Sequence, residues 1–307
     1  MIGFLNINKP KDCTSHDVVL KLRKSLGIKK IGHSGTLDPF ATGLLVVCVG
    51  PAVKLARYFL GAPKAYEGVI RFGQTTVSGD TTCPISESTT NVPESFEVIN
   101  EMAKKFKLQP YLQLPPMHSA KKQGGTPLYK LARQGIEVER EHKLCHLFEF
   151  DILSYNKPHV TFRVVCSSGT YIRTLAQDFG RLLGSVALLE QLNRAGSGHL
   201  ICQNALSVAQ IEEADKNGQL WNELPCWIGF DRLLDGYERA YANEDEVKAL
   251  AQGKQNVLIN ITRRIQPSAI QLPGQENKSC IAIYHGNKLV AVARQENSVW
   301  GLDRVFN

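Results

Sequence analysis

The N-terminal third of the chain alternates between short apolar runs and an amphipathic segment. Residues 4–8 and the continuous apolar run 44–49 predict strands. Between them, apolar residues recur at helical spacing from residue 18 to residue 26. Thr14, followed three residues later by Asp17, resembles a helix capping box, and Gly27 is a typical helix end. We therefore expect one capped helix between two buried strands.

The middle of the chain continues this mixture of helical and strand patterns. A stretch rich in Ser, Thr and Pro, residues 75–93, predicts an excursion over the surface. The same reasoning predicts helices at residues 53–60, 96–106, 170–183 and 207–222, strands at 69–72 and 160–166, and an apolar run at 186–192.

Two segments stand apart from this pattern. Residues 109–143 combine prolines, a Gly124-Gly125 pair and basic side chains, which predicts an inserted, mobile lobe. After a break near Asp235-Gly236, strand-like runs at 257–261, 280–284 and 289–293 with a turn at 285–287 predict a small β-rich module.

Composition places the 307-residue chain among ordinary globular proteins, with 43% hydrophobic and 21% charged residues. It predicts one large domain with an appendage, or two unequal domains. The closest two of the eight cysteines, Cys145 and Cys166, are too far apart in sequence for a CxxC zinc unit, so we expect no metal and free thiols in the cytoplasm. No secretion signal and no apolar run of ~18 residues is recognised, which predicts no membrane span.

The net charge of +7 is concentrated at the front of the chain. Residues 1–65 hold ten Lys or Arg against three Asp, and residues 121–143 hold six against three Glu. Clustered basic charge is typical of proteins that bind phosphate-rich partners, although solvated lysines on an ordinary surface would give the same count.

The most informative stretch is IGHSGTLDPFATG at residues 31–43. KAYEGVIRFG (64–73), residues 115–133, SGTYIRTL (168–175) and LNRAGSG (192–198) follow it in order. Together they resemble the TruB family of pseudouridine synthases. The resemblance implies an α+β fold with a mixed, largely antiparallel sheet and flanking helices. It also implies a catalytic domain at 1–236 with a thumb-like insertion at about 109–143, and a PUA-like RNA-binding module at 237–307.

The resemblance assigns the chemistry to three residues. Asp38 is expected to attack or stabilise the anomeric carbon of a uridine, Arg173 to pair with that carboxylate, and Tyr66 to stack on the base and take part in proton removal. From the residues alone, Asp38 is an ordinary Asp-Pro turn, Arg173 a solvated helix residue and Tyr66 a tyrosine at the sheet edge.

Further residues are expected to bind the RNA. His33 matches the family histidine that fills the place of the extruded nucleotide, and Leu192 matches an apolar residue of the base pocket. Without the resemblance, His33 would be interpreted as an ordinary loop histidine and Leu192 as a core leucine. His118 departs from the expected tyrosine. The remaining expected contacts are Gly35, Thr36, Leu37, Lys64, Lys122, Tyr129, Arg133 and Tyr171.

The implied activity is conversion of uridine 55 in the tRNA T-loop to pseudouridine. No metal, nucleotide or redox cofactor is expected, because no Walker loop or GxGxxG motif is present. The expected partner is the T-arm and elbow of tRNA, bound by a monomer without guide RNA or an obligatory protein. Two alternatives stay open: a tRNA-folding factor with incidental catalysis, and a guide-RNA-dependent synthase.

Overall fold

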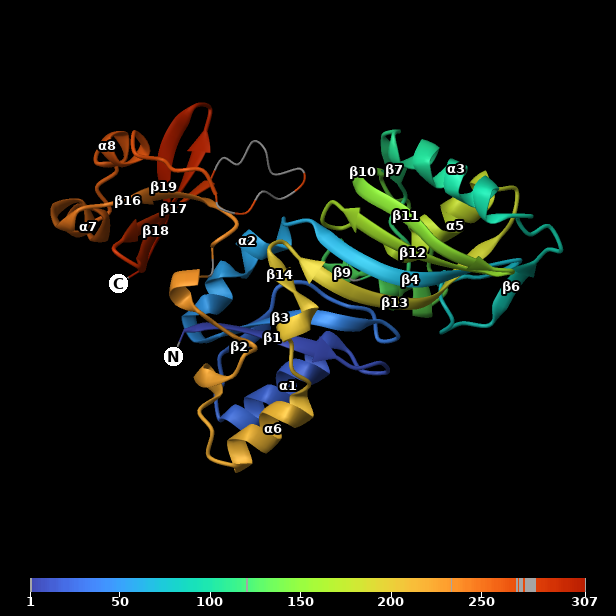
Figure 1. The fold of residues 1–307 in the computed structure, drawn as a ribbon, viewed down its shortest axis with the longest axis horizontal. Helices are drawn as coiled ribbons and strands as arrows, with labels where there is room; N and C mark the ends of the chain where they lie inside the picture. The colour runs from blue at the N-terminus through green and yellow to red at the C-terminus, as the bar shows by residue number, and fades with distance from the viewer. Residues whose placement is uncertain are drawn as a thin grey trace.

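The computed structural model describes residues 2–119, 121–232, 234–268, 270, 273 and 280–306. Figure 1 shows a long, twisted central sheet with helices on both faces and a separate small sheet near the C-terminus. All eight cysteines are free thiols. No helix in the described residues is long and apolar enough to cross a membrane.

The central sheet has nine strands and a mixed direction. Its order is β11-β12-β4-β13-β3-β1-β15, with β14 paired to β13 and β2 to β3. Every pairing is antiparallel except that of β13 with β3, which is parallel. The expected mixed, largely antiparallel sheet is therefore confirmed. The strands are β1 Gly3–Lys9, β2 Ile31–His33, β3 Thr42–Val49, β4 Lys64–Phe72, β11 Leu147–Asn156, β12 His159–Cys166, β13 Ala187–Ser197, β14 Leu200–Ile201 and β15 Trp227–Gly229.

Helices cover the two ends of this sheet in different layers (Figure 1). Helices α3 Phe96–Lys107 and α5 Ile172–Leu182 bury apolar faces against the β11-β12-β4-β13 end. Helices α1 Ser15–Leu26 and α6 Val208–Lys216 cover one face of β1 and β3, and α2 Ala56–Leu60 packs on the opposite face. The two faces of β1 and β3 are both apolar because each is covered.

The lobe predicted at residues 109–143 is built from short elements. A two-stranded ribbon of β7 Tyr111–Gln113 and β10 Lys143–Cys145 forms its base. Beyond the ribbon lie β8 Lys122–Gln123, β9 Thr126–Pro127 and α4 Leu128–Arg133. The β7–β10 ribbon thus joins the lobe to the main domain beside the first turn of α5.

The C-terminal region forms a four-stranded sheet with two helices. Its order is β16-β17-β18-β19, with strands Glu238–Tyr241, Cys280–His285, Lys288–Glu296 and Val299–Val305 and helices α7 Glu244–Ala251 and α8 Leu258–Thr262. One face of this sheet joins the main domain, because Ala282, Tyr284 and Leu289 share a buried cluster with Phe4 and Leu44.

Most predicted elements are present, and one prediction is wrong. The capping box of Thr14 and Asp17 and the left-handed Gly27 are found at the ends of α1. Residues 257–261 are not a strand: Val257 is the N-cap of α8 and the rest lie in the helix, where Leu258 and Ile261 are buried three residues apart on one face. The stretch 75–93, expected as surface, forms the hairpin of β5 Gln74–Thr76 and β6 Ile85–Ser88 and also buries several polar side chains.

Candidate active site

The IGHSGTLDPFATG motif forms a loop that runs from β2 into β3. Gly35 and Gly43 adopt positive φ angles of 125° and 100°, which favour glycine. Ser15 Oγ accepts a hydrogen bond from the Leu37 amide at 2.9 Å. The buried ammonium of Lys9 donates to the carbonyl of Pro39 at 3.2 Å. The backbone on both sides of Asp38 is therefore anchored to the first strand and helix.

This loop forms one wall of a pocket of about 360 Å³. The opposite walls come from β4, the turn before α5, and β13. Eight of the residues expected to act on the RNA line it, namely Gly35, Thr36, Leu37, Asp38, Lys64, Tyr66, Tyr171 and Leu192. With Ser119 of the lobe, five segments far apart in sequence thus converge on one cavity.

Arg173 does not line the pocket, and it contacts Asp38 from the interior of the protein. Its Nε donates to Asp38 Oδ2 at 2.8 Å. The arginine side chain is 5% exposed, whereas that of Asp38 is 36% exposed. The Asp38 carboxylate is therefore accessible from the pocket, whereas its ion-pair partner Arg173 is buried. The interpretation of Arg173 as a solvated helix residue is wrong.

The guanidinium of Arg173 has three further partners. It donates to the carbonyl oxygens of Ser78 and His118, each at 2.8 Å, and Asp80 Oδ2 lies 3.6 Å from its Nε. A positive charge in the first turn of a helix is unfavourable with the helix dipole. Two carboxylates offset this cost and leave the planar group almost no freedom to rotate.

Asp80 is itself held rigidly. It is 3% exposed, and its Oδ1 accepts hydrogen bonds from Ser78 Oγ at 2.7 Å and from the Thr82 amide at 2.9 Å. The Thr82 hydroxyl donates to the same oxygen. With Oδ1 occupied, Oδ2 is the oxygen that faces Arg173.

The electrostatics of Asp38 balance opposing effects. Burial raises the pKa of the Asp38 carboxyl above its ordinary value; the charge of Arg173 opposes this rise and that of Asp80 adds to it. The effect of Arg173 was expected from the sequence. Asp80, a buried carboxylate beside the same Nε atom, was not expected.

Tyr66 and Lys64 lie on the same face of β4, two residues apart. Burial raises the pKa of Tyr66, so its hydroxyl is neutral near pH 7. Burial also lowers the pKa of Lys64 to about 7, with the charge of Arg194 acting in the same direction. The Lys64 ammonium donates to the carbonyls of Phe59 and Ala62 at 3.0 and 2.6 Å, and so attaches the end of α2 to the pocket floor.

Other expected residues do not line the pocket. His33 lies at the start of the loop, where burial and then the charge of Arg194 lower its pKa and favour the neutral ring. Tyr129 is in α4 of the lobe, and its amide donates to the carbonyl of Ser119 at 3.0 Å. Lys122 and Arg133 are placed in β8 and α4, and their side chains lie outside the described part of the structure.

Sequence reasoning missed two buried charged residues that support the site. Arg194 is 2% exposed; it donates from Nε to the Leu44 carbonyl at 2.7 Å and lies 3.4 Å from the carbonyls of Gly35 and Thr36. Arg194 lies within the LNRAGSG motif at 192–198, so the family motif could have identified it. Asp80 stood in a Ser/Thr-rich stretch, and nothing in its neighbours indicated burial.

The fold matches that of chains in solved Cbf5 and H/ACA ribonucleoprotein complexes. A solved Cbf5-Nop10-Gar1 complex contains a chain with TM-score 0.74 and 22% identity, matched over 99% of this chain and 84% of that chain. An H/ACA ribonucleoprotein bound to a substrate RNA containing 2'-deoxyuridine gives TM-score 0.72 and 21% identity over 99% and 85%. At such identities the likeness establishes the fold alone.

Sequence comparison gives the family. Residues 23–172 match the N-terminal domain of the TruB family of pseudouridylate synthases. Proteins called tRNA pseudouridine synthase B are 44% identical over 73% of the chain in Dechloromonas aromatica, which is 74% of that protein. The Burkholderia lata protein is 34% identical over 99% of this chain and 89% of its own length. The Dehalococcoides mccartyi protein is 35% identical over 100% of this chain and 97% of its own length. The chain belongs to the TruB family of pseudouridine synthases.

Proposed function

We propose that the enzyme converts uridine 55 in the T-loop of tRNA to pseudouridine, with Asp38 as the nucleophile. The observation that carries the proposal is the Asp38–Arg173 ion pair at 2.8 Å. The buried arginine holds a carboxylate that is accessible from the pocket. The names of the relatives, tRNA pseudouridine synthase B, support tRNA as the substrate.

The chemistry requires breaking and remaking one bond at the sugar. A carboxylate oxygen of Asp38 attacks or stabilises C1' as the bond from C1' to N1 of uracil breaks. The detached base rotates and C5 bonds to C1' as Asp38 is released from C1'; the proton on C5 then leaves, and N1 takes up a proton. The sum is an isomerisation, so it needs no external oxidant, reductant or group donor.

The neighbouring residues have supporting roles in this proposal. Arg173 and Asp80 hold the reacting carboxylate in place, and Arg194 holds the carbonyls of the catalytic loop. Tyr66 packs against the base as a neutral phenol. Removal of the C5 proton by Tyr66 therefore requires its pKa to fall when the RNA is bound.

Reaching the glycosidic bond requires extruding the nucleotide, at a cost of about a few kcal/mol. The neutral ring of His33, beside the loop, is suited to replacing the extruded base within a stack, because an uncharged ring has less to lose on desolvation. The basic lobe at 109–143 would contact phosphates of the T-arm without reading sequence.

We further propose residues 1–236 as the catalytic domain and residues 237–307 as an RNA-binding module, acting as a cytoplasmic monomer without guide RNA. The lobe supports independence from a guide, because it offers a stand-alone enzyme its own grip on the RNA. Eight free thiols support a reducing compartment.

The test uses the purified full chain and an unmodified tRNA transcript, followed by chemical mapping of pseudouridine. We expect modification at position 55 with no added RNA or protein. A transcript with cytidine at position 55 is the control. Modification only after addition of a guide RNA or protein partner, or at another position, would overturn the proposal.

A further inference from the structure

The base of the lobe is bonded to helix α5 at two places. Tyr111 and Gln113 of β7 lie two residues apart in one strand, and both side chains are buried on the same side. The Tyr111 hydroxyl donates to Asp178 Oδ2 at 2.8 Å, and the Gln113 amide contacts Tyr171, the N-cap residue of α5. The two helix positions are seven residues apart, about two turns, so β7 follows one face of α5.

The contact between Gln113 and Tyr171 has the form of a main-chain pairing. The Tyr171 amide donates to Gln113 Oε1 at 2.7 Å, and Gln113 Nε2 donates to the Tyr171 carbonyl at 3.0 Å. The Tyr171 N–H is one of the donors that a helix start cannot pair internally, and the tyrosine side chain does not cap the helix. Gln113 is 1% exposed, so it supplies the missing acceptor from another part of the chain with little competition from water.

The orientation of the Gln113 amide is fixed by its other neighbours. A carboxylate can only accept hydrogen bonds, so the Tyr111 hydroxyl directs its hydrogen to Asp178. The oxygen of that hydroxyl accepts from Gln113 Nε2 at 2.8 Å, which leaves Oε1 for the Tyr171 amide. A reversed amide would place its own N–H groups against the N–H of Tyr171. One arrangement therefore satisfies all four residues.

The residue held in this way belongs to the uridine pocket. Tyr171 lines the pocket, and Arg173, two residues further on, donates to Asp38 at 2.8 Å. The segment that carries Gln113 continues to His118, whose carbonyl accepts from Arg173 at 2.8 Å. Two consecutive prolines between Gln113 and His118 restrict the backbone. The same short segment thus holds the start of α5 at two points.

We propose that Gln113 is a positioning residue of the isomerisation, because its side-chain amide fixes the Tyr171 peptide and with it the first turn of α5. The proposal rests on the role proposed above for Asp38. Gln113 is not among the residues that line the pocket, so it acts on the reaction through Tyr171 and Arg173. A displaced helix start would weaken the contact from Arg173 to Asp38, and an error of about 1 Å in the placement of reacting groups can cost about 10²-fold in rate.

Two variants of the full chain test the amide. Gln113→Met keeps the length of the side chain and removes all its polar contacts. Gln113→Glu keeps an acceptor for the Tyr171 amide but cannot donate to the Tyr171 carbonyl, and it serves if Gln113→Met does not fold. On one unmodified tRNA transcript, we expect the single-turnover rate at saturating enzyme to fall roughly 10–100-fold in both, with little change in RNA affinity. A wild-type rate in either folded variant would overturn the proposal.

The acid limb of the rate separates positioning from a loss of folded enzyme. The charge of Arg173 lowers the pKa of Asp38, so a weaker contact lets that pKa rise, and the limb should move to higher pH in both Gln113 variants. Asp80 and Lys9, which also face Asp38, are unchanged. A smaller amount of folded enzyme lowers the rate without moving the limb. A reduced rate with the limb at its wild-type pH would therefore contradict the positioning role.

Amide hydrogen exchange measures the Gln113–Tyr171 contact without RNA. Labelling with ¹⁵N-tyrosine gives one main-chain signal for each of the nine tyrosines. In Gln113→Met the Tyr171 amide should exchange faster, because its acceptor is gone, whereas the amide of Tyr284 in β17 should keep its wild-type rate. Unaltered exchange at Tyr171 would refute the proposed contact.

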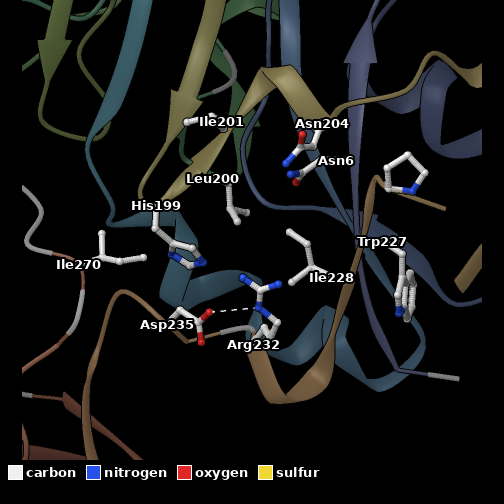
Figure 2. A pocket seen from close by; sticks show the side chains of 11 residues that line it. Asn6, His199, Leu200, Ile201, Asn204, Trp227, Ile228, Arg232, Asp235 and Ile270 are labelled. Atoms are coloured by element: carbon white, nitrogen blue, oxygen red, sulfur yellow. Dashed lines mark hydrogen bonds and ion pairs between the residues drawn. The ribbon is translucent and has the colours of Figure 1, made fainter. Parts of the chain in front are cut away.

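Asn204 supplies a matched control. It is exposed and lines a second cavity of about 190 Å³ (Figure 2), and no residue of that cavity lines the uridine pocket. Asn204→Asp makes the same amide-to-carboxylate change as Gln113→Glu and should leave the rate and its acid limb unaltered. An equal loss in Asn204→Asp would overturn the assignment to Gln113. Every value is a ratio to the wild-type chain, so it tests Gln113 whichever uridine reacts, whereas the position of the pseudouridine tests the proposed function.

Discussion

At the scale of single residues, the site depends on one guanidinium with four oxygen partners. Arg173 contacts Asp38, Ser78, His118 and Asp80. Its planar fork suits several acceptors at once, which an ammonium cannot match. The reacting carboxylate is therefore placed by a group that cannot turn away without breaking contacts to two other parts of the chain, the turn with Ser78 and Asp80 and the lobe with His118.

Asp38→Asn should abolish pseudouridine formation and leave RNA affinity unchanged or slightly tighter. The amide is nearly isosteric with the carboxylate, but it is uncharged and a poor nucleophile, and its introduction removes an anion near the phosphates. Single-turnover rates and filter-binding affinities on one transcript check this. If Asp38→Asn reacts at near the wild-type rate, another group performs the attack.

The rate should fall on the acid side at a higher pH than an ordinary aspartate would give. Burial raises the pKa of Asp38, and below that pKa the carboxyl is protonated and cannot attack, so the single-turnover rate drops about tenfold per pH unit. Asp38 is faced by Arg173, Asp80 and Lys9.

Asp80→Asn offers the matched change. It removes the carboxylate that adds to the raised pKa and retains the shape of the side chain, so the acid limb should move to lower pH while the plateau rate falls. Circular dichroism at each pH controls for unfolding. A limb that stays in place would mean that Asp80 has only a structural role.

At the scale of elements, the one parallel pairing of the central sheet brings the catalytic loop to β13. Gly43 pairs with Arg194 there, at a φ of 100°. A Cβ atom on Gly43 would lie 2.5 Å from the Arg194 carbonyl oxygen and from Asn193 Oδ1. Only a glycine lets the loop and the strand that carries Arg194 approach this closely.

Gly43→Ala should therefore lower the free energy of unfolding by roughly 1–3 kcal/mol, through backbone strain and overpacking. It should also slow catalysis, because Arg194 holds the loop carbonyls. Gly61→Ala is the control, since Gly61 has a helical φ of −77° and no atom within 4 Å of a new Cβ. Urea unfolding of both variants measures the difference; equal stabilities would refute the close-approach argument.

Prediction from the sequence succeeded where local rules decide the structure. The capped helix at residues 15–26 and the buried strand at 42–49 follow from capping chemistry and an uninterrupted apolar run. It failed at 257–261, where four apolar residues and one asparagine suit a strand and a buried helix equally well.

The site divides in the same way. The family motifs led to Asp38, Tyr66 and Arg173, and the structure brings these three together. Asp80 could not be found from its neighbours, because the burial of a Ser/Thr-rich turn depends on hydrogen bonds that close only in three dimensions.

At the scale of the whole molecule, the main domain and the C-terminal region share a core. Tyr284 is 2% exposed and belongs to the cluster that contains Phe4 and Leu44 of the central sheet. Asp303 of β19 forms an ion pair at 2.7 Å with Arg57, and the Tyr237 hydroxyl donates to the Tyr58 carbonyl at 2.6 Å. Removing the region would expose apolar surface on the catalytic domain, so a truncated chain is a poor test of its role in binding.

Tyr284→Ala should destabilise the chain by about 3–5 kcal/mol, the range for loss of a large buried aromatic side chain. Because the cluster is shared, hydrogen exchange should accelerate in β1 and β3 as well as in β17. Val299→Ala, at a residue that is 70% exposed, should leave both regions unchanged. Faster exchange confined to the C-terminal strands would show that the two parts unfold independently.

The contact between Arg173 and the His118 carbonyl has a consequence for fidelity. The acceptor is a main-chain carbonyl, which every residue type has. His118 therefore accepts the same hydrogen bond from Arg173 that the expected tyrosine would accept at this position. The carbonyl belongs to the lobe proposed to grip the T-arm. An RNA that holds the lobe out of place would leave the arginine one partner short, and Asp38 less well positioned. Discrimination against wrong RNAs would then act on the rate of the chemical step more than on affinity.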